Sequence, residues 1–195
     1  MYKGAFAMRE LFRKKQILTI PNLLSLVRLL LIPLIVYLYC VAENYYGALG
    51  IVVLSGATDL VDGFIARRFN MISDLGKILD PAADKLTQTA LFICLTSKYP
   101  LMWVLFGIFA AKEIGMIVMG AIDMKKTESV NGAKWYGKVN TAVIYGTMML
   151  LILLPNMDPI LANAILIFNG AVMIISLALY MHFYWKHIKE NKKQD

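Results

Sequence analysis

Four aspartates stand in two pairs, and each pair is spaced so that both carboxylates share one face of a helix. Asp59 and Asp62 form the first pair, and Asp80 and Asp84 form the second. At about 100° per residue, spacings of three or four residues bring side chains to the same helix face. Four carboxylates held together repel one another and take up protons unless cations hold them. Oxygen ligands without His or Cys favour hard divalent cations, so the two pairs indicate a Mg²⁺ or Mn²⁺ site.

Small residues accompany both pairs of aspartates. Gly63 and Ala66 share the face of the first pair, and Gly76 lies one turn before Asp80. Positions without a bulky side chain let the flat groups and phosphates of a ligand approach the backbone. Arg67 follows directly and offers a fork of donors for a phosphate oxygen. Together these residues describe a divalent-metal site for a pyrophosphate.

Ordinary chemistry of helix ends is the alternative interpretation of the aspartates. Asp80 as a helix cap, followed by Pro81 as the first helical residue, would fit a common helix start. Caps at the membrane interface, with salt bridges to nearby cations, require neither a shared face nor the accompanying glycines. For Arg67 the alternative is simple anchoring at the membrane surface, which is the expected role of Arg68.

The chain that positions these residues is apolar. It has 195 residues, of which 59% are hydrophobic and 17% charged, and its mean hydropathy is +0.62. That balance points to a bilayer as the solvent, where a spanning helix needs roughly 20 apolar residues. The sequence predicts an all-α membrane protein with six transmembrane helices, the third of them short unless it begins before Pro81. They are expected at Ile17–Tyr39, Tyr45–Ala66, Pro81–Thr96, Leu101–Ile122, Val139–Leu154 and Pro159–Trp185.

The positive charges fall on alternate loops of this arrangement. The formal net charge is +7, and most Lys and Arg residues precede Ile17, lie at 67–85 or 125–138, or follow Trp185. The other loops hold only Lys98. The positive-inside rule therefore predicts cytosolic termini and a cytosolic active site in the cell membrane. Short basic clusters between apolar runs suit a membrane surface, and we expect no nucleic-acid partner.

The rest of the chain offers few signs of further organisation. Residues 1–16 form a juxtamembrane segment, either a short amphipathic helix on the leaflet or a solvated basic tail. No repeat or long linker divides the sequence, so residues 1–195 are predicted to form a single domain. Cys40 and Cys94 both lie in apolar runs, and neither a disulfide scaffold nor a zinc site is expected.

The acidic residues form a recognisable run. From Asp59 to Asp84 it reads D-x-x-D-G-x-x-A-R, eight residues, G, three residues, D, three residues, D. This run resembles the signature of the CDP-alcohol phosphatidyltransferase family at every defined position. The segment Pro21-Asn22-Leu23-Leu24-Ser25, with Arg28, resembles the one that precedes the signature in bacterial phosphatidylglycerophosphate synthases.

The resemblance implies a reaction and a role for each matching residue. An acceptor hydroxyl would attack the β-phosphorus of CDP-diacylglycerol, and CMP would leave. The resemblance implies that residues at matching positions serve as metal ligands, general base, nucleotide pocket and phosphate contact. The metal ligands would be Asp59, Asp62, Asp80 and Asp84, binding two Mg²⁺ or Mn²⁺ ions, with Asp84 also the general base. The nucleotide and substrate contacts would be Gly63, Ala66, Arg67, Gly76, Asn22 and Arg28. The resemblance also suggests a homodimer.

Three lysines are candidates to bind the acceptor. Lys112 lies beside Glu113 in an apolar segment, where a structural ion pair is the alternative role. Many phosphatidylglycerophosphate synthases have Ala-Arg-Glu where this chain has Ala111-Lys112-Glu113. Lys134 and Lys138 flank two aromatic residues, so an interfacial belt is their alternative role.

Glycerol 3-phosphate is the leading prediction for the acceptor. The same chemistry would serve phosphatidylglycerol, an inositol phosphate or serine. A membrane cation transporter is the competing function, since carboxylates within the membrane also line ion pathways. Transport sites lie near the bilayer midplane on broken helices, whereas these carboxylates gather at predicted cytosolic helix ends.

Overall fold

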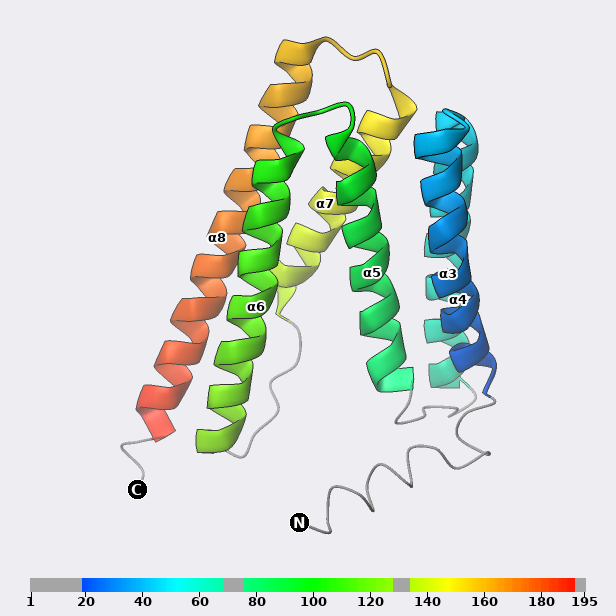
Figure 1. The fold of residues 1–195 in the computed structure, drawn as a ribbon. Coiled ribbons are helices and arrows are strands. Elements are labelled where there is room, and N and C mark those ends of the chain that lie inside the picture. The colour runs from blue at the N-terminus through cyan, green and yellow to red at the C-terminus, as the bar shows by residue number, and fades with distance from the viewer. Residues whose placement is uncertain (1–18, 69–75, 128–133, 192–195) are drawn as a thin grey trace. The chain divides into compact units, whose positions relative to one another are not determined.

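The structure is a computed structural model that describes residues 19–68, 76–127 and 134–191, and all of its regular elements there are helical. The chain separates into two compact units, the first ending at Cys94 and the second beginning at Leu95. The first unit holds α3, η1, α4 and nearly all of α5, and the second holds α6, α7 and α8 (Figure 1). The predicted N-terminal amphipathic helix lies outside the described residues.

Helix α3 (Ile20–Val36) has a well-defined start and an irregular end. Thr19 caps it, because its hydroxyl accepts a hydrogen bond from the Asn22 backbone N–H at 3.4 Å. Pro21 stands in the first turn, where a missing N–H costs nothing. Pro33, near the other end, cannot donate to the helix ladder, and the chain passes into the π-helical turn η1 (Tyr37–Val41).

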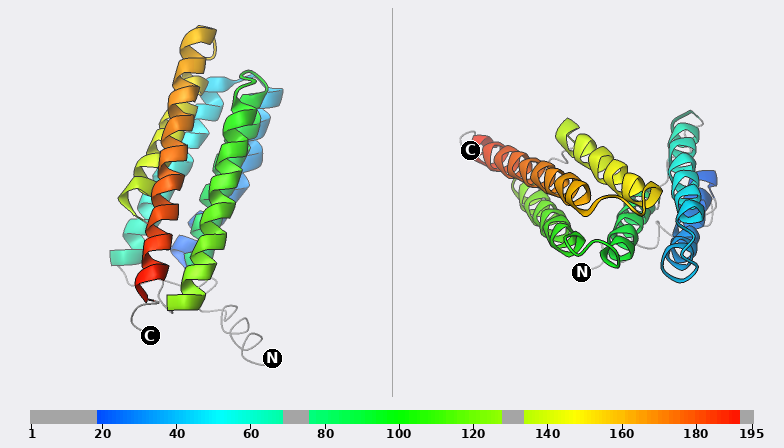
Figure 2. Two further views of the ribbon diagram at one scale, coloured as in Figure 1. Left: turned by 90° about the vertical axis from the view of Figure 1, so that its left-hand side faces the viewer. Right: turned by 90° about the horizontal axis from the view of Figure 1, so that it is seen from above.

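Asn44 ends the connection that reverses the chain into α4 (Tyr45–Arg68). Its side-chain oxygen accepts from the Gly47 N–H at 2.9 Å, as expected of a helix cap. Glu43 just before it takes a positive φ of 50°, which makes the reversal tight. Helices α3 and α4 then run side by side in opposite directions (Figure 2), burying Ile35 and Val52.

Helix α5 (Gly76–Thr96) begins before Pro81. The interpretation of Asp80 as the cap of this helix is therefore wrong, because Asp80 and Pro81 both lie inside it. Pro81 stands in the second turn, so it removes only one hydrogen bond, close to the helix start. The earlier start places Gly76, Asp80 and Asp84 on one continuous helix.

In the second unit, α8 (Pro159–Asn191) packs against both α6 (Met102–Thr127) and α7 (Trp135–Leu153), as Figure 2 shows. Asp158 caps α8 by accepting from the backbone N–H groups of Ile160 and Leu161, at 2.8 and 3.2 Å. The core of this unit is formed by large apolar side chains: Met102, Leu105 and Phe109 from α6, Ile144, Met148 and Leu151 from α7, and Leu166 and Met173 from α8.

Four helices in the described residues are long and apolar enough to cross a membrane. They comprise Asn22–Val41, Met102–Met124, Trp135–Leu153 and Pro159–Lys189. The two helices that carry the aspartates, α4 and α5, are not among them. Within the described residues, an α-helix lies at each of the six positions where a span is predicted, and four of these helices are apolar enough to cross a membrane by length and composition.

Candidate active site

Arg28 joins the three helices of the first unit through its guanidinium. Its Nη2 lies 2.6 Å from Asp59 Oδ1 on α4, and its Nη1 lies 2.7 Å from Asp84 Oδ1 on α5. The Arg28 side chain is only 2% exposed, whereas the two carboxylates are about two-fifths exposed, at 40% and 41%. One aspartate of each pair, Asp59 and Asp84, therefore contacts the same buried group, the Arg28 guanidinium.

Helix α3 supplies a second contact one turn before Arg28. Ser25 donates a hydrogen bond from its hydroxyl to Asp80 Oδ1 on α5. Asn22, Ser25 and Arg28 recur every three residues and are all buried, although α3 is otherwise strongly apolar. Leu23, Leu26 and Leu30 on the same helix are exposed. The first span therefore presents a polar face to the aspartates and an apolar face to its surroundings.

The structure brings Asp59, Asp80 and Asp84 to this polar face of α3. Ser25 is the contact that sequence reasoning did not single out as a site residue. Its signal was the spacing Asn22, Ser25, Arg28, which places three polar side chains on one face of an apolar helix. Arg28, which the resemblance predicts to contact the substrate, pairs with two aspartates of the signature.

The last turns of α4 carry the other predicted residues of the site. Asp62, Gly63, Ala66 and Arg67 continue the same helix as Asp59, so the predicted helix register is present. Their side-chain contacts lie outside the described residues. Gly76 is buried at the first position of α5, one turn before Asp80.

The donor chemistry at Arg28 fits a hard divalent cation. Among the side chains that the structure describes, no three Asp, Glu, His or Cys residues gather into a complete metal cage, and Asp62 is outside that set. Asp59 and Asp84 nevertheless offer carboxylate oxygens from two helices to one positive group, the Arg28 guanidinium. Such oxygen ligands suit Mg²⁺ or Mn²⁺.

The three candidate acceptor lysines belong to the second unit and differ in environment. Lys112 is 2% exposed, and its Nζ lies 2.8 Å from Glu113 Oε1. Lys134 precedes α7, and its Nζ lies 4.0 Å from the centre of the Phe183 ring, a cation–π contact. Lys138 is exposed on α7. Lys112 is thus the buried cation of the three, and the contact of Lys134 agrees with an aromatic anchor.

Lys112 shares its height along α8 with two other buried polar residues. Helix α6 runs parallel to α8, since Asp123 Oδ1 lies 2.7 Å from His187 Nδ1 and Gly115 faces Leu177. Lys112 precedes Asp123 by as many residues as Ser176 precedes His187, so Lys112 and Ser176 stand at the same height. The sequence alone did not indicate Ser176 as a site residue.

Helix α7 brings an asparagine to the same height. The rings of Tyr136 and Tyr180 meet at 4.6 Å between centroids, and the two helices are antiparallel. Asn140, one turn after Tyr136, therefore stands level with Ser176, one turn before Tyr180. We call Lys112, Asn140 and Ser176 the polar level of the second unit. Both side-chain atoms of Asn140 and the Ser176 hydroxyl are buried without a hydrogen-bond partner in the described part of the chain.

Comparison with known proteins identifies the class. The family model of the CDP-alcohol phosphatidyltransferases matches residues 18–182, which includes most of both units. The chain belongs to the CDP-alcohol phosphatidyltransferase family, whose members generally depend on a divalent metal. It is accordingly a multi-pass membrane enzyme that uses CDP-diacylglycerol and an alcohol.

The relatives include two kinds of enzyme. A CDP-diacylglycerol–glycerol-3-phosphate 3-phosphatidyltransferase from Aquifex aeolicus is 34% identical over 84% of this chain and 90% of its own. A CMP-forming cardiolipin synthase from Streptomyces coelicolor is 36% identical over 71% of this chain and 66% of its own. Another cardiolipin synthase, from Rattus norvegicus, is 52% identical, but over 40% of this chain and 26% of its own.

Proposed function

We propose that this enzyme transfers the phosphatidyl group of CDP-diacylglycerol to glycerol 3-phosphate, yielding phosphatidylglycerophosphate and CMP. The observation that carries the chemistry is the convergence of Asp59 and Asp84, from two helices, on the buried Arg28. The likeness to the Aquifex aeolicus enzyme, which extends over most of both chains, supports glycerol 3-phosphate as the acceptor.

The four aspartates of the signature are the proposed ligands of two Mg²⁺ or Mn²⁺ ions. When bound, such ions neutralise the pyrophosphate and the leaving CMP. Arg28 holds Asp59 and Asp84 together, and Ser25 orients Asp80. We assign Asp84 the further role of accepting the proton of the acceptor hydroxyl.

The Arg28 guanidinium, which lies between Asp59 and Asp84, would also offer donors to a substrate phosphate. A planar fork of donors suits a phosphate oxygen as well as it suits a carboxylate. Asn22 on the same face is the second contact proposed from α3. On α4 and α5, the proposed nucleotide contacts are Gly63, Ala66, Arg67 and Gly76.

Acceptor binding is assigned to Lys112, with Lys134 and Lys138 as further candidates. A buried polar group that lacks a partner costs about 1–3 kcal/mol, and the polar level contains two such side chains. Asn140 and Ser176 therefore offer hydrogen bonds for a polar ligand or an ordered water. Lys112 adds a positive charge that Glu113 balances.

A second acceptor, phosphatidylglycerol, is favoured by one observation. The segment shared with the Rattus norvegicus cardiolipin synthase is 52% identical, well above the 34% found with the Aquifex aeolicus enzyme. Its short coverage, 40% of this chain, limits the comparison to part of the enzyme. Glycerol 3-phosphate remains our first choice because the longer likeness includes most of the chain.

The remaining features of the proposal concern the membrane and the assembly. Six helices cross the bilayer, both termini face the cytosol, and the aspartates lie on the cytosolic side of the cell membrane. The distribution of Lys and Arg over alternate loops supports this orientation. We also propose one catalytic domain over the whole chain and a homodimer as its assembly.

A direct assay tests the reaction and the acceptor together. Purified protein is incubated with CDP-diacylglycerol and Mg²⁺ or Mn²⁺, and glycerol 3-phosphate, phosphatidylglycerol, inositol phosphate and serine are supplied singly. We expect CMP release that depends on metal and on glycerol 3-phosphate. CMP release with phosphatidylglycerol and with no other acceptor would identify a cardiolipin synthase instead. Absence of CMP release with every acceptor would contradict the proposal.

A further inference from the structure

Gln88 is a buried polar residue of α5 to which the proposed reaction gives no role. Its side chain is 1% exposed, and its Oε1 has no hydrogen-bond partner in the described part of the chain. Thr87 beside it is also buried, but its hydroxyl donates to the Ala83 carbonyl at 2.9 Å. A buried acceptor without a donor costs stability unless a ligand or an ordered water supplies one. Gln88 therefore offers an acceptor to a bound molecule.

Gln88 continues the row of carboxylates on α5. Asp80, Asp84 and Gln88 recur every four residues, so each lies one turn further along the helix and about 40° further round it. Asp80 contacts Ser25 and Asp84 contacts Arg28, so α5 runs in the same direction as α3. Side chains four residues apart have Cβ atoms about 5–6 Å from each other. Gln88 is therefore the next polar group after the proposed general base.

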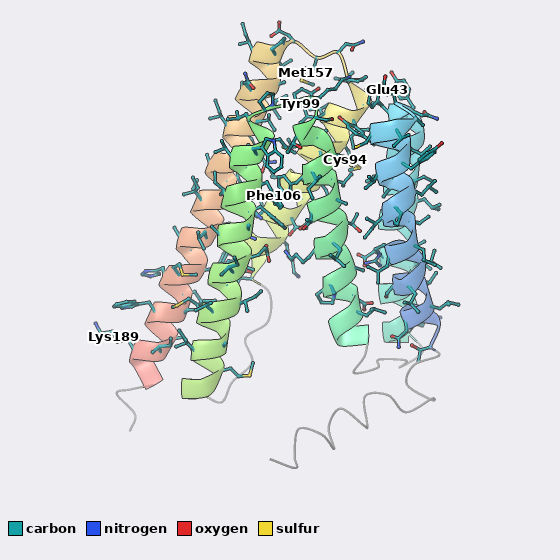
Figure 3. The ribbon with its side chains drawn as sticks, viewed as in Figure 1. Glu43, Cys94, Tyr99, Phe106, Met157 and Lys189 are labelled. Carbon is teal, nitrogen blue, oxygen red and sulfur yellow. The ribbon has the colours of Figure 1, made fainter. Side chains whose placement is uncertain are left out.

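The position of Gln88 is on the side of the aspartates away from the proposed nucleotide contacts. Gly76 is the first residue of α5, and the helix continues past Gln88 toward Cys94, which Figure 3 labels near its other end. Helix α4 runs opposite to α3, and its Ser55 is buried one turn before Asp59. Both helices thus extend the site by one polar residue in the same direction, beyond the carboxylates.

The missing donor points to a hydroxyl group. A hydroxyl both donates and accepts, so it satisfies the Gln88 amide in either of its two orientations. The esters of CDP-diacylglycerol have no donor, and its nucleotide is proposed to bind on the other side of the aspartates. The acceptor alcohol is the reactant that remains. Glycerol 3-phosphate has two hydroxyls on adjacent carbons, and only one of them attacks.

We propose that Gln88 selects acceptors that carry two hydroxyls on adjacent carbons, an inference that rests on the proposed reaction. The attacking oxygen bonds to the β-phosphorus as CMP leaves, and its proton passes to Asp84. The neighbouring hydroxyl donates a hydrogen bond to Gln88 Oε1, so that the alcohol is held by both of its oxygens. Glycerol 3-phosphate and phosphatidylglycerol both present such a pair of hydroxyls, whereas serine presents a single one.

The experiment compares acceptors that differ by one hydroxyl. Full-length enzyme in detergent, with CDP-diacylglycerol and Mg²⁺ or Mn²⁺, receives either glycerol 3-phosphate or 3-hydroxypropyl phosphate, which lacks only the middle hydroxyl. Phosphatidylglycerol is compared with phosphatidyl-1,3-propanediol in the same way. For the pair that the wild type uses, we expect kcat/KM for CMP release to be about 10–100-fold higher with the diol.

Gln88→Met keeps the length of the side chain and removes its amide. This variant should lower kcat/KM for the diol by about 10–100-fold and leave that for the analogue within about twofold, because only the diol loses a hydrogen bond. The KM for CDP-diacylglycerol should not change. Thr87→Val is the matched control, since it removes a buried hydroxyl that is bonded within its own helix, and it should keep the wild-type preference.

Three results would overturn the proposal. The first is a wild-type enzyme that uses the diol and its analogue equally well, a comparison that does not depend on the folding of any variant. The second is a Gln88→Met enzyme that keeps the wild-type preference. The third is an equal loss of activity with both acceptors, as a purely structural role of Gln88 predicts. Absence of CMP release with either diol would contradict the proposed reaction itself, and this inference with it, so the two failures are distinguishable.

Discussion

Replacement of Arg28 by glutamine tests the centre of the proposed site. The guanidinium makes two charge-assisted contacts, at 2.6 Å to Asp59 and 2.7 Å to Asp84. Each such contact contributes about 1.5–3 kcal/mol. The two carboxylates are about two-fifths exposed, so solvent screens them, and we take the lower end for each. The loss in the metal-free protein is then about 3 kcal/mol of unfolding free energy.

Divalent metal should restore much of this loss. Without Arg28 the carboxylates of Asp59 and Asp84 repel each other, and a bound cation relieves that repulsion. For about 3 kcal/mol, the unfolding midpoint of the metal-free variant should fall by roughly 6–12 °C. Saturating Mg²⁺ should then raise the midpoint of Arg28→Gln more than that of the wild type.

The assay must report on the first unit. All three tryptophans, at positions 103, 135 and 185, lie in the second unit, so their fluorescence is a poor probe. Cys94 is buried in the first unit, and a thiol-reactive dye in a Cys40→Ser background therefore reports when that unit opens. Arg68→Gln is the matched control, because it removes one positive charge from an exposed position on α4. Equal midpoints and equal metal responses in the two variants would refute the assigned role of Arg28.

Three further predictions concern the reaction. Asp84→Asn should lower CMP release by about 10²–10⁴-fold while CDP-diacylglycerol binding by calorimetry largely survives, and a loss of affinity equal to that of Asp80→Asn would remove the general-base role. Ser25→Ala removes the hydrogen bond to Asp80, so the Mg²⁺ concentration for half-maximal activity should rise about tenfold, and an unchanged value would make Ser25 a packing residue. Lys112→Met should raise the acceptor KM about tenfold or more with little change in that for CDP-diacylglycerol. Lys98→Met, at an exposed position where the lysine donates to the Pro155 carbonyl, is the control and should leave both KM values unchanged. Equal increases in both KM values for Lys112→Met would indicate general damage.

Local sequence was sufficient for the helices and for the shared faces of the aspartates. The spacing of Asp80 and Asp84 places them on one face wherever the helix begins, because the helical repeat is a local property. The same repeat carried the interpretation of Arg67 and Gly76 as neighbours of the acidic pairs. These inferences did not require knowledge of which helices meet.

Local sequence left the start of α5 open between two interpretations. Asp80 followed by Pro81 is a good helix start, and proline at the first position costs nothing. The helix instead begins at Gly76, with Asp80 held by Ser25 from α3. A contact between residues so far apart in the chain cannot be read from the propensities of either segment.

Tertiary structure alone decided what the buried polar side chains face. The sequence showed that Asn22, Ser25 and Arg28 share a face of α3, but an apolar helix packs in several rotations with similar burial. Packing against α4 turned Arg28 toward Asp59 and Asp84, where the charge found two partners. In the same way, Asn140 and Ser176 came to one height only through the register of α7 on α8. Sequence determines which residues each helix offers, and the packing between helices determines which of them meet.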